Sequence, residues 1–239
     1  MLTGQKVVIV GGSSGIGLET ARRAAAEGAE IVIASRSRHK LEQAKSAIGT
    51  GAKVTSHILD VTDEEQMRLF FEQTGTFDHL VVSAAETSGG PFLATPTSTA
   101  RSLFENKFWG QYYAAKYAAP MLTPNGSITL FSGVVAFKSM IGSSMLGAVN
   151  AAVANLGRTL ALELAPLRVN VVSPGIIDTP SRAGMAEESR NSFYSSTAAK
   201  LPVQRVGTAA DVAEGVLYLI HNGFTTGTVL HIDGGHSLI

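Results

Sequence analysis

The sequence has no cysteine, no excess of charge of either sign and no long apolar run, and each absence excludes a class of protein. Without cysteine, the chain has no disulfide, no thiolate metal site and no cysteine nucleophile, which agrees with a cytoplasmic location. Lysine and arginine total 19, as do aspartate and glutamate, so we expect neither a nucleic-acid partner nor a membrane-surface partner. No window approaches the ~20 apolar residues of a membrane span, and the N-terminus has no signal-peptide pattern. The 6 histidines lack metal-site spacing, so no metal is expected.

What the sequence does contain is a regular alternation of short β-branched runs and longer stretches rich in alanine and leucine. The apolar run Val7-Val8-Ile9-Val10 predicts a strand buried on both faces, as in a parallel sheet. Strands are expected at Lys6–Val10, Glu30–Ala34, Lys53–Ile58, His79–Ser83, Ser127–Phe131, Arg168–Val172 and Thr228–Ile232. Helices are expected at Ile16–Glu27, His39–Ile48, Glu64–Gln73, Thr97–Ala119, Ser143–Leu164, Ser181–Ala199 and Ala209–His221. We therefore predict a single α/β domain over residues 1–239, with a doubly wound parallel sheet of about seven strands and helices on both faces.

A glycine-rich turn joins the first strand to the first helix. The run Val10-Gly11-Gly12-Ser13-Ser14-Gly15-Ile16-Gly17 has the spacing G-x-x-x-G-x-G rather than the common dinucleotide spacing G-x-G-x-x-G. Such a turn lets backbone N–H groups approach a pyrophosphate, while the helix N-terminus adds partial positive charge. The alternative is a tight turn that binds nothing. The candidate phosphate-binding residues are Gly11, Ser13, Ser14, Gly15, Ile16 and Gly17.

These motifs resemble those of the short-chain dehydrogenase/reductase superfamily over almost the whole chain. The turn is similar to the family's T-G-x-x-x-G-x-G loop, with Val10 in the threonine position. Three later segments resemble family motifs in the same order: Leu59–Thr62, Arg168–Gly175 and Gly227–Gly235. The resemblance implies a Rossmann-like fold, a nicotinamide cofactor, a small-molecule substrate and a homodimer or homotetramer. The further cofactor-binding residues that it implies are Asp60 and Val61 near adenine, Ser83 and Ala84 in the altered fourth-strand motif Val82–Ala85, and Pro174, Gly175, Ile177 and Thr179 near the nicotinamide.

The end of the second strand bears on the choice between NAD(H) and NADP(H). NAD-specific relatives carry an acidic residue there, which accepts hydrogen bonds from the ribose hydroxyls. This chain has Ser35 at that position, followed directly by Arg36. A carboxylate would repel a 2′-phosphate, whereas a guanidinium pairs with it. The alternative is that Arg36 and Arg38 form a solvated pair at a helix entry. We favour NADP(H).

The resemblance does not extend to the family's catalytic Asn-Ser-Tyr-Lys tetrad. Aligning the motifs places Lys107 at the Asn position, Gly133 at the Ser position, Leu146 at the Tyr position and Asn150 at the Lys position. Leu146 cannot carry the proton that the family's tyrosine moves, and positioned acid–base catalysis contributes about 10²–10⁴-fold. The usual mechanism is therefore not expected here.

Three polar residues are the candidates that replace the tetrad: Lys107, Ser132 and Asn150. Lys107 is expected either to point into the nicotinamide pocket or to lie on a solvated helix surface. The sequence predicts an NADP(H)-dependent oxidoreductase with a non-standard site, acting on a small carbonyl-type or otherwise activated substrate. The alternatives are a non-catalytic NADP(H)-binding sensor or regulatory subunit, and a scaffold that binds no cofactor.

Overall fold

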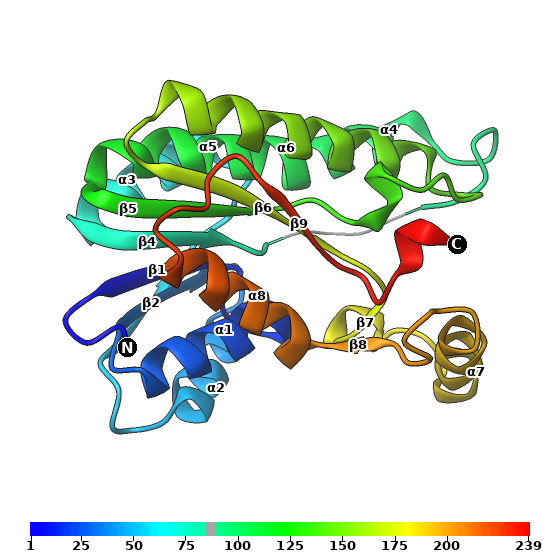
Figure 1. The fold of residues 1–239 in the computed structure, drawn as a ribbon, viewed down its shortest axis with the longest axis horizontal. Coiled ribbons are helices and arrows are strands. Elements are labelled where there is room, and N and C mark those ends of the chain that lie inside the picture. Colours follow the sequence, from blue (N-terminus) through cyan, green and yellow to red (C-terminus); the bar gives the residue numbers. More distant parts are fainter. Residues whose placement is uncertain (85–88) are drawn as a thin grey trace.

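A parallel sheet runs through the centre of the computed structural model, which describes residues 1–84 and 89–239 (Figure 1). Its strand order is β3-β2-β1-β4-β5-β6-β9, and every pair of neighbours is parallel. A short second sheet pairs β7 with β8. The strands are β1 (Lys6–Val10), β2 (Glu30–Ser35), β3 (Val54–Ile58), β4 (Phe77–Val82), β5 (Leu122–Phe131), β6 (Arg168–Pro174), β7 (Ile177–Asp178), β8 (Gly207–Thr208) and β9 (Val229–Ile232).

Helices cover both faces of the large sheet (Figure 1). Three of them, α1, α2 and α8, lie on one face, and α3, α4, α5 and α6 lie on the other. No helix among the described residues is both long and apolar enough to cross a membrane. The helices are α1 (Gly15–Ala26), α2 (Arg38–Ile48), α3 (Glu64–Thr74), α4 (Thr97–Phe104), α5 (Gly110–Ala118), α6 (Ser144–Glu163), α7 (Glu187–Ala198) and α8 (Ala209–His221).

Successive residues of the central strands enter two different hydrophobic cores. Val8 and Val10 of β1 pack with the helices of the α3 side, while Val7 and Ile9 pack with those of the α1 side. All four side chains are fully buried, as expected for a strand with helices on both faces. The predicted fold, a doubly wound parallel sheet of seven strands, is confirmed.

The predicted helix over residues 97–119 is wrong in one respect, because it is not one regular helix. A π-helical turn, Glu105–Trp109, separates α4 from α5, and a 3-10 turn, Ala119–Met121, follows α5. A π turn bonds residue i to i+5 and so holds one residue more than the matching α turn. The predicted helix over 181–199 is likewise divided, into a 3-10 turn at Pro180–Arg182 and α7.

Candidate functional site

A cleft of about 490 Å³ opens at the carboxyl edge of the sheet. The strand order reverses between β1 and β4, and in open α/β sheets ligands bind outside the carboxyl ends of the strands at such a reversal. The cleft walls come from the segments that follow β1, β2, β3, β4, β5 and β6, together with the π turn and one face of α6. Its volume lies within the range of small-molecule sites.

The cleft brings together all but one of the residues predicted for the site. These are Gly11, Ser13, Ser14, Gly15, Ile16, Gly17, Ser35, Arg36, Val61, Ser83, Ala84, Lys107, Ser132, Asn150, Pro174, Gly175, Ile177 and Thr179. Asp60 does not line it, and its Oδ1 accepts hydrogen bonds from the Thr62 backbone N–H (3.0 Å) and hydroxyl (2.8 Å). The contact of Asp60 with adenine stays a prediction. Ala85, the last residue of the altered fourth-strand motif, lies outside the described residues.

Two glycines shape the floor of the cleft. Gly11 has φ +92°, and a Cβ added to it would come within 2.8 Å of the Ser83 carbonyl carbon. A Cβ on Gly17 would come within 2.9 Å of the Gly11 carbonyl carbon and would also overlap the Ser83 hydroxyl. Both positions therefore require glycine, because the turn after β1 packs directly against the end of β4. The first N–H groups of α1, which have no acceptor inside the helix, face the cleft from this turn.

Lys107 is buried, with 4% of its surface exposed, although it lies in a wall of the cleft. Its Nζ donates a hydrogen bond to the Ser132 carbonyl oxygen at 3.0 Å. No carboxylate among residues 1–84 and 89–239 forms an ion pair with this ammonium. Burial lowers the pKa of Lys107 from the ordinary 10.5 to about 8. Lys107 therefore does not lie on a solvated helix surface, and its place in the nicotinamide pocket stays a prediction.

The π turn and Gln111 together hold Lys107 in this orientation. Lys107 lies within the turn, where the extra residue changes which side chains face the sheet. One turn later, the buried Gln111 donates from Nε2 to the Lys107 carbonyl (2.9 Å) and to the Phe131 carbonyl (3.0 Å). Its Oε1 accepts from the Phe131 N–H at 2.6 Å. These bonds fix the helix against the end of β5, where Ser132 follows.

Ser132, Gly133 and Asn150 form a compact polar group opposite the glycine turn. The Ser132 hydroxyl donates to the Asn150 backbone carbonyl at 2.8 Å. A Cβ on Gly133 would come within 2.8 Å of Asn150 Nδ2, so the glycine leaves room for the amide. Asn150 Oδ1 is buried and has no hydrogen-bond partner in the described part of the chain. Leu146, one turn before Asn150 on α6, adds an apolar patch to the same wall.

The charged side chains that line the cleft are all cationic as far as the structure describes it. Arg36 and Lys40 follow β2, whereas Lys107 contacts the end of β5 and Arg182 follows β6. Sequence reasoning missed Lys40 and Arg182. Lys40 lies in the first turn of α2, and no motif of the sequence singles it out. Arg182 lies in a segment rich in serine and alanine, and no motif singles it out.

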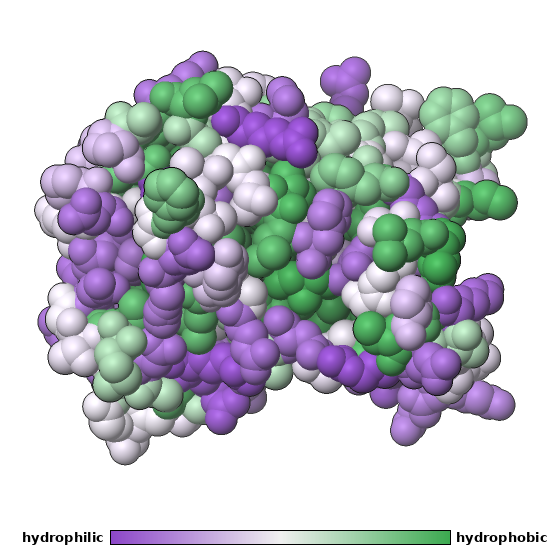
Figure 2. Space-filling view, in the orientation of Figure 1, coloured by the Kyte–Doolittle hydropathy of each residue, from purple (hydrophilic) through white to green (hydrophobic). Residues whose placement is uncertain are grey.

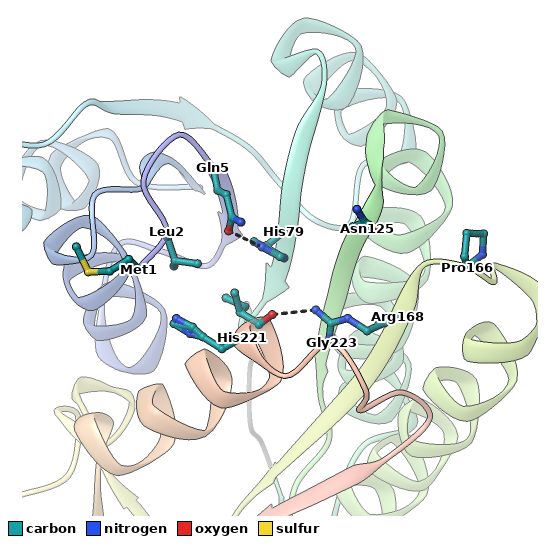
Figure 3. A pocket seen from close by; sticks show the side chains of 10 residues that line it. Met1, Leu2, Gln5, His79, Asn125, Pro166, Arg168, His221 and Gly223 are labelled. Atoms are coloured by element: carbon teal, nitrogen blue, oxygen red, sulfur yellow. Dashed lines mark hydrogen bonds between the residues drawn. The ribbon is translucent and has the colours of Figure 1, made fainter.

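A second hollow, of about 550 Å³, lies at the opposite, amino-terminal edge of the sheet (Figure 3). Its polar groups bond to the protein itself. His79 lies between the Ser127 hydroxyl (2.8 Å) and Gln5 Oε1 (3.0 Å). Arg168 donates to the Leu219 and Ile220 carbonyls at the end of α8, at 2.6 and 2.9 Å. These bonds join β6 to α8, so we assign the hollow a structural role and place the candidate site at the carboxyl edge.

The chain is similar to known proteins over almost its whole length. A family model described as enoyl-(acyl carrier protein) reductase matches residues 10–237. The chain is 31% identical to a 3-oxoacyl-(acyl-carrier-protein) reductase of Thermotoga maritima, over 98% of each chain. It is 30% identical to carbonyl reductase family member 4 of Danio rerio, over 97% of this chain and 98% of the relative. The crystal structure of a small-chain dehydrogenase in complex with NADPH superposes with a TM-score of 0.87 at 37% identity, over 98% of this chain and 99% of that one.

Proposed function

The chain belongs to the short-chain dehydrogenase/reductase superfamily, and from that premise we propose that it is an NADP(H)-dependent oxidoreductase acting on a small carbonyl-type or similarly activated substrate. One observation carries the proposal. The glycine turn and a buried lysine line the same cleft, at the edge of the sheet where the strand order reverses. Relatives over nearly the full length are oxidoreductases by name.

The residues of the cleft fit a dinucleotide. The missing Cβ atoms of Gly11 and Gly17 let the turn pack closely enough to expose its N–H groups to a pyrophosphate. Ser35 Oγ and Asn150 Oδ1 are buried without a hydrogen-bond partner among the described residues, and ribose hydroxyls would satisfy both. When bound, the cofactor supplies or accepts a hydride.

NADP(H) is favoured over NAD(H) by the residues after β2. Ser35 stands where an acidic residue would select NAD(H), and both Arg36 and Lys40 line the cleft beside it. Two cations suit a 2′-phosphate, which a carboxylate would repel. The solved small-chain dehydrogenase in complex with NADPH, at 37% identity, supports the same choice.

The proposed site is non-standard, because the aligned tetrad positions hold Lys107, Gly133, Leu146 and Asn150. All four residues line the cleft, which supports the proposal that they stand in place of the tetrad. Leu146 and Gly133 can neither donate nor accept a proton through their side chains. In this proposal Lys107 takes over the acid's role, and Ser132 and Asn150 hold the substrate or the cofactor beside it.

Lys107 is suited to protonate a substrate oxygen. Its pKa of about 8 keeps it mostly charged at neutral pH, yet it gives up the proton more readily than an ordinary lysine. The buried setting limits exchange with water, and the Ser132 carbonyl holds the ammonium in place. We expect reduction to slow as the pH rises through about 8, because the neutral amine has no proton to give. Substrates that need little acid assistance, such as dicarbonyls and quinones, are favoured.

Paired titrations with NADPH and NADH, followed by nucleotide fluorescence, test the cofactor assignment. We expect NADPH to bind more tightly, and Arg36→Ala to weaken NADPH but not NADH. Arg38→Ala is the matched control, since Arg38 begins α2 but does not line the cleft. A preference for NADH would contradict the Arg36 argument, and binding of neither would favour a scaffold.

Turnover tests the chemistry separately. NADPH oxidation with diacetyl and with phenanthrenequinone is expected, and Lys107→Met should lower kcat for diacetyl by about 10²–10⁴-fold. The quinone needs less acid assistance, so its rate should fall less. Tight NADPH binding without turnover of any substrate class would instead favour the non-catalytic sensor or regulatory subunit.

A homodimer or homotetramer is part of the proposal. Figure 2 shows hydrophobic residues gathered near the C-terminus, where Leu238 is 84% exposed and Phe137 is 40% exposed. On the α5 side, Trp109 is 37% exposed and stacks on Tyr113. Exposed apolar groups of this kind are typical of subunit contacts. Light scattering after size-exclusion chromatography would give the mass, and a monomer would contradict the proposal.

A further inference from the structure

Three of the four cations that line the described part of the cleft lie where the cofactor's phosphates would bind. In the proposed arrangement Arg36 and Lys40, which follow β2, serve the 2′-phosphate. Arg182 shares a turn with Thr179, and this turn packs against the glycine turn, since a Cβ on Gly15 would lie 3.5 Å from Thr179 Cβ. The pyrophosphate proposed at the glycine turn therefore accounts for Arg182.

Lys107, the fourth cation, lies on the other side of the glycine turn. Its ammonium is hydrogen-bonded to the carbonyl of Ser132, which follows β5, and β4 separates β5 from β1 in the sheet. Two strand spacings, roughly 10 Å, thus lie between this carbonyl and the end of β1. A dinucleotide binds across the crevice at the reversal of strand order. Because its adenosine half extends toward β2 in the proposed arrangement, its nicotinamide half extends over β4 and β5, toward Lys107.

The charge of Lys107 distinguishes the two redox forms of the cofactor. The nicotinamide ring is neutral in NADPH and positive in NADP⁺, whereas the phosphates of the two forms are the same. Lys107 is buried, so salt and water screen its charge little, and no carboxylate among the described residues lines the cleft to balance it. Like charges within about 6–8 Å of each other in such a site weaken binding by about 10–100-fold.

We propose that Lys107 makes the cleft selective for the reduced cofactor, by holding a buried positive charge beside the place of the nicotinamide ring. The inference rests on the proposed function for the identity of the cofactor, but it concerns binding and is independent of turnover. Lys107 couples the occupancy of the cleft to the ratio of NADPH to NADP⁺. A reductase built in this way releases its oxidised cofactor readily, and a non-catalytic sensor built in this way responds to that ratio.

Calorimetric titrations at neutral pH with NADPH, NADP⁺ and 2′-phospho-ADP-ribose test the inference. The third ligand lacks the nicotinamide ring but keeps every phosphate. The wild-type chain should bind NADPH about 10–100-fold more tightly than NADP⁺. Lys107→Met, and Lys107→Gln with its neutral donor, should bring the two dissociation constants to within about threefold of each other by tightening NADP⁺. Both variants should leave the affinity for 2′-phospho-ADP-ribose within about threefold of wild type.

Two controls separate the charge of Lys107 from other effects. Lys40→Met should weaken all three ligands by a similar factor, because all three carry the 2′-phosphate. Lys116→Met, on the exposed side of α5, should weaken none of them.

Equal affinity of the wild-type chain for NADPH and NADP⁺ would overturn the inference. An equal loss of all three ligands in Lys107→Met would also overturn it, because Lys107 would then serve a phosphate. If the selectivity and its loss in Lys107→Met are found but no substrate turns over, the inference stands and only the proposed reaction fails. Turnover without selectivity would leave the proposed reaction and remove the inference, and binding of no nucleotide would overturn both.

Discussion

Replacing Lys107 with methionine should make the protein more stable while it removes the proposed acid. The drop in the pKa of Lys107 from 10.5 to about 8 corresponds to a cost on the order of 3 kcal/mol for holding the charged ammonium at neutral pH. Methionine has a similar unbranched shape without the charge. It also leaves the Ser132 carbonyl without its donor, which costs about 1–2 kcal/mol. We therefore expect a net gain of about 1–2 kcal/mol, or roughly 2–8 °C in Tm for a chain of this length.

The pH dependence of this gain separates charge burial from simple repacking. The pKa of the folded chain lies below that of the unfolded chain, so unfolding takes up a proton between pH about 8 and 10.5. Wild-type stability from this group rises with pH across that window, and the advantage of Lys107→Met should shrink toward zero by about pH 9.5. Urea unfolding at neutral pH and at about pH 9.5 measures the stability advantage of Lys107→Met. Lys116→Met is an exposed control and should change stability by no more than about 0.5 kcal/mol. A gain that does not change with pH, or a loss at neutral pH, would refute the reasoning.

Three further predictions concern the turn and the amino-terminal edge. Gly17→Ala should abolish NADPH binding in the fluorescence titration, because the added Cβ overlaps Gly11 and Ser83; unchanged affinity would show that the turn can relax. Burial lowers the pKa of His79 from 6.5 to about 4, so the unfolded chain binds more protons between these values. Stability should therefore fall as the pH drops through that window, by on the order of 3 kcal/mol, and denaturation of His79→Asn should show a flatter profile. Arg168→Met should lower stability by about 2–4 kcal/mol in urea unfolding, since it leaves two buried carbonyls at the end of α8 unpaired; a loss below about 0.5 kcal/mol would contradict its structural role.

Most of the sheet could be predicted from the sequence, because its strands are strongly apolar and closely bounded by turns. The first strand matches its predicted bounds, Lys6–Val10, and the edge strand β9 is shorter than predicted by one residue, Thr228. The divided helix over 97–119 could not be predicted in the same way. Its residues favour helix throughout, and a π turn keeps that local preference while it changes the hydrogen-bond pattern. The position of the π turn depends on tertiary packing, in particular on the hydrogen bonds between Gln111 and the end of β5.

The residues of the candidate site also differ in whether the sequence could predict their place in the structure. The glycine turn could be predicted from the local sequence, because the spacing of Gly11, Gly15 and Gly17 after a buried strand indicates it directly. The environment of Lys107 does not follow, because a lysine on an amphipathic helix is usually solvated, and its burial depends on the rotation of a helix relative to the sheet. Arg182 was missed because nothing in its local sequence marks it, and only the folded chain places it in the cleft, to which residues far apart in the sequence contribute.

The π turn at Glu105–Trp109 has a consequence for how such a site could arise or disappear in evolution. Losing the one extra residue would convert the turn to regular α-helix and leave α4 and α5 in about their present orientations, because the π turn takes up the extra residue locally. A single-codon deletion would therefore change which residues of the turn face the sheet, Lys107 among them, while most substitutions in α4 would leave the orientation of Lys107 intact. The genetic change to look for among descendants that have lost this chemistry is therefore a gap in the alignment, at a place where residue-by-residue comparison shows nothing unusual.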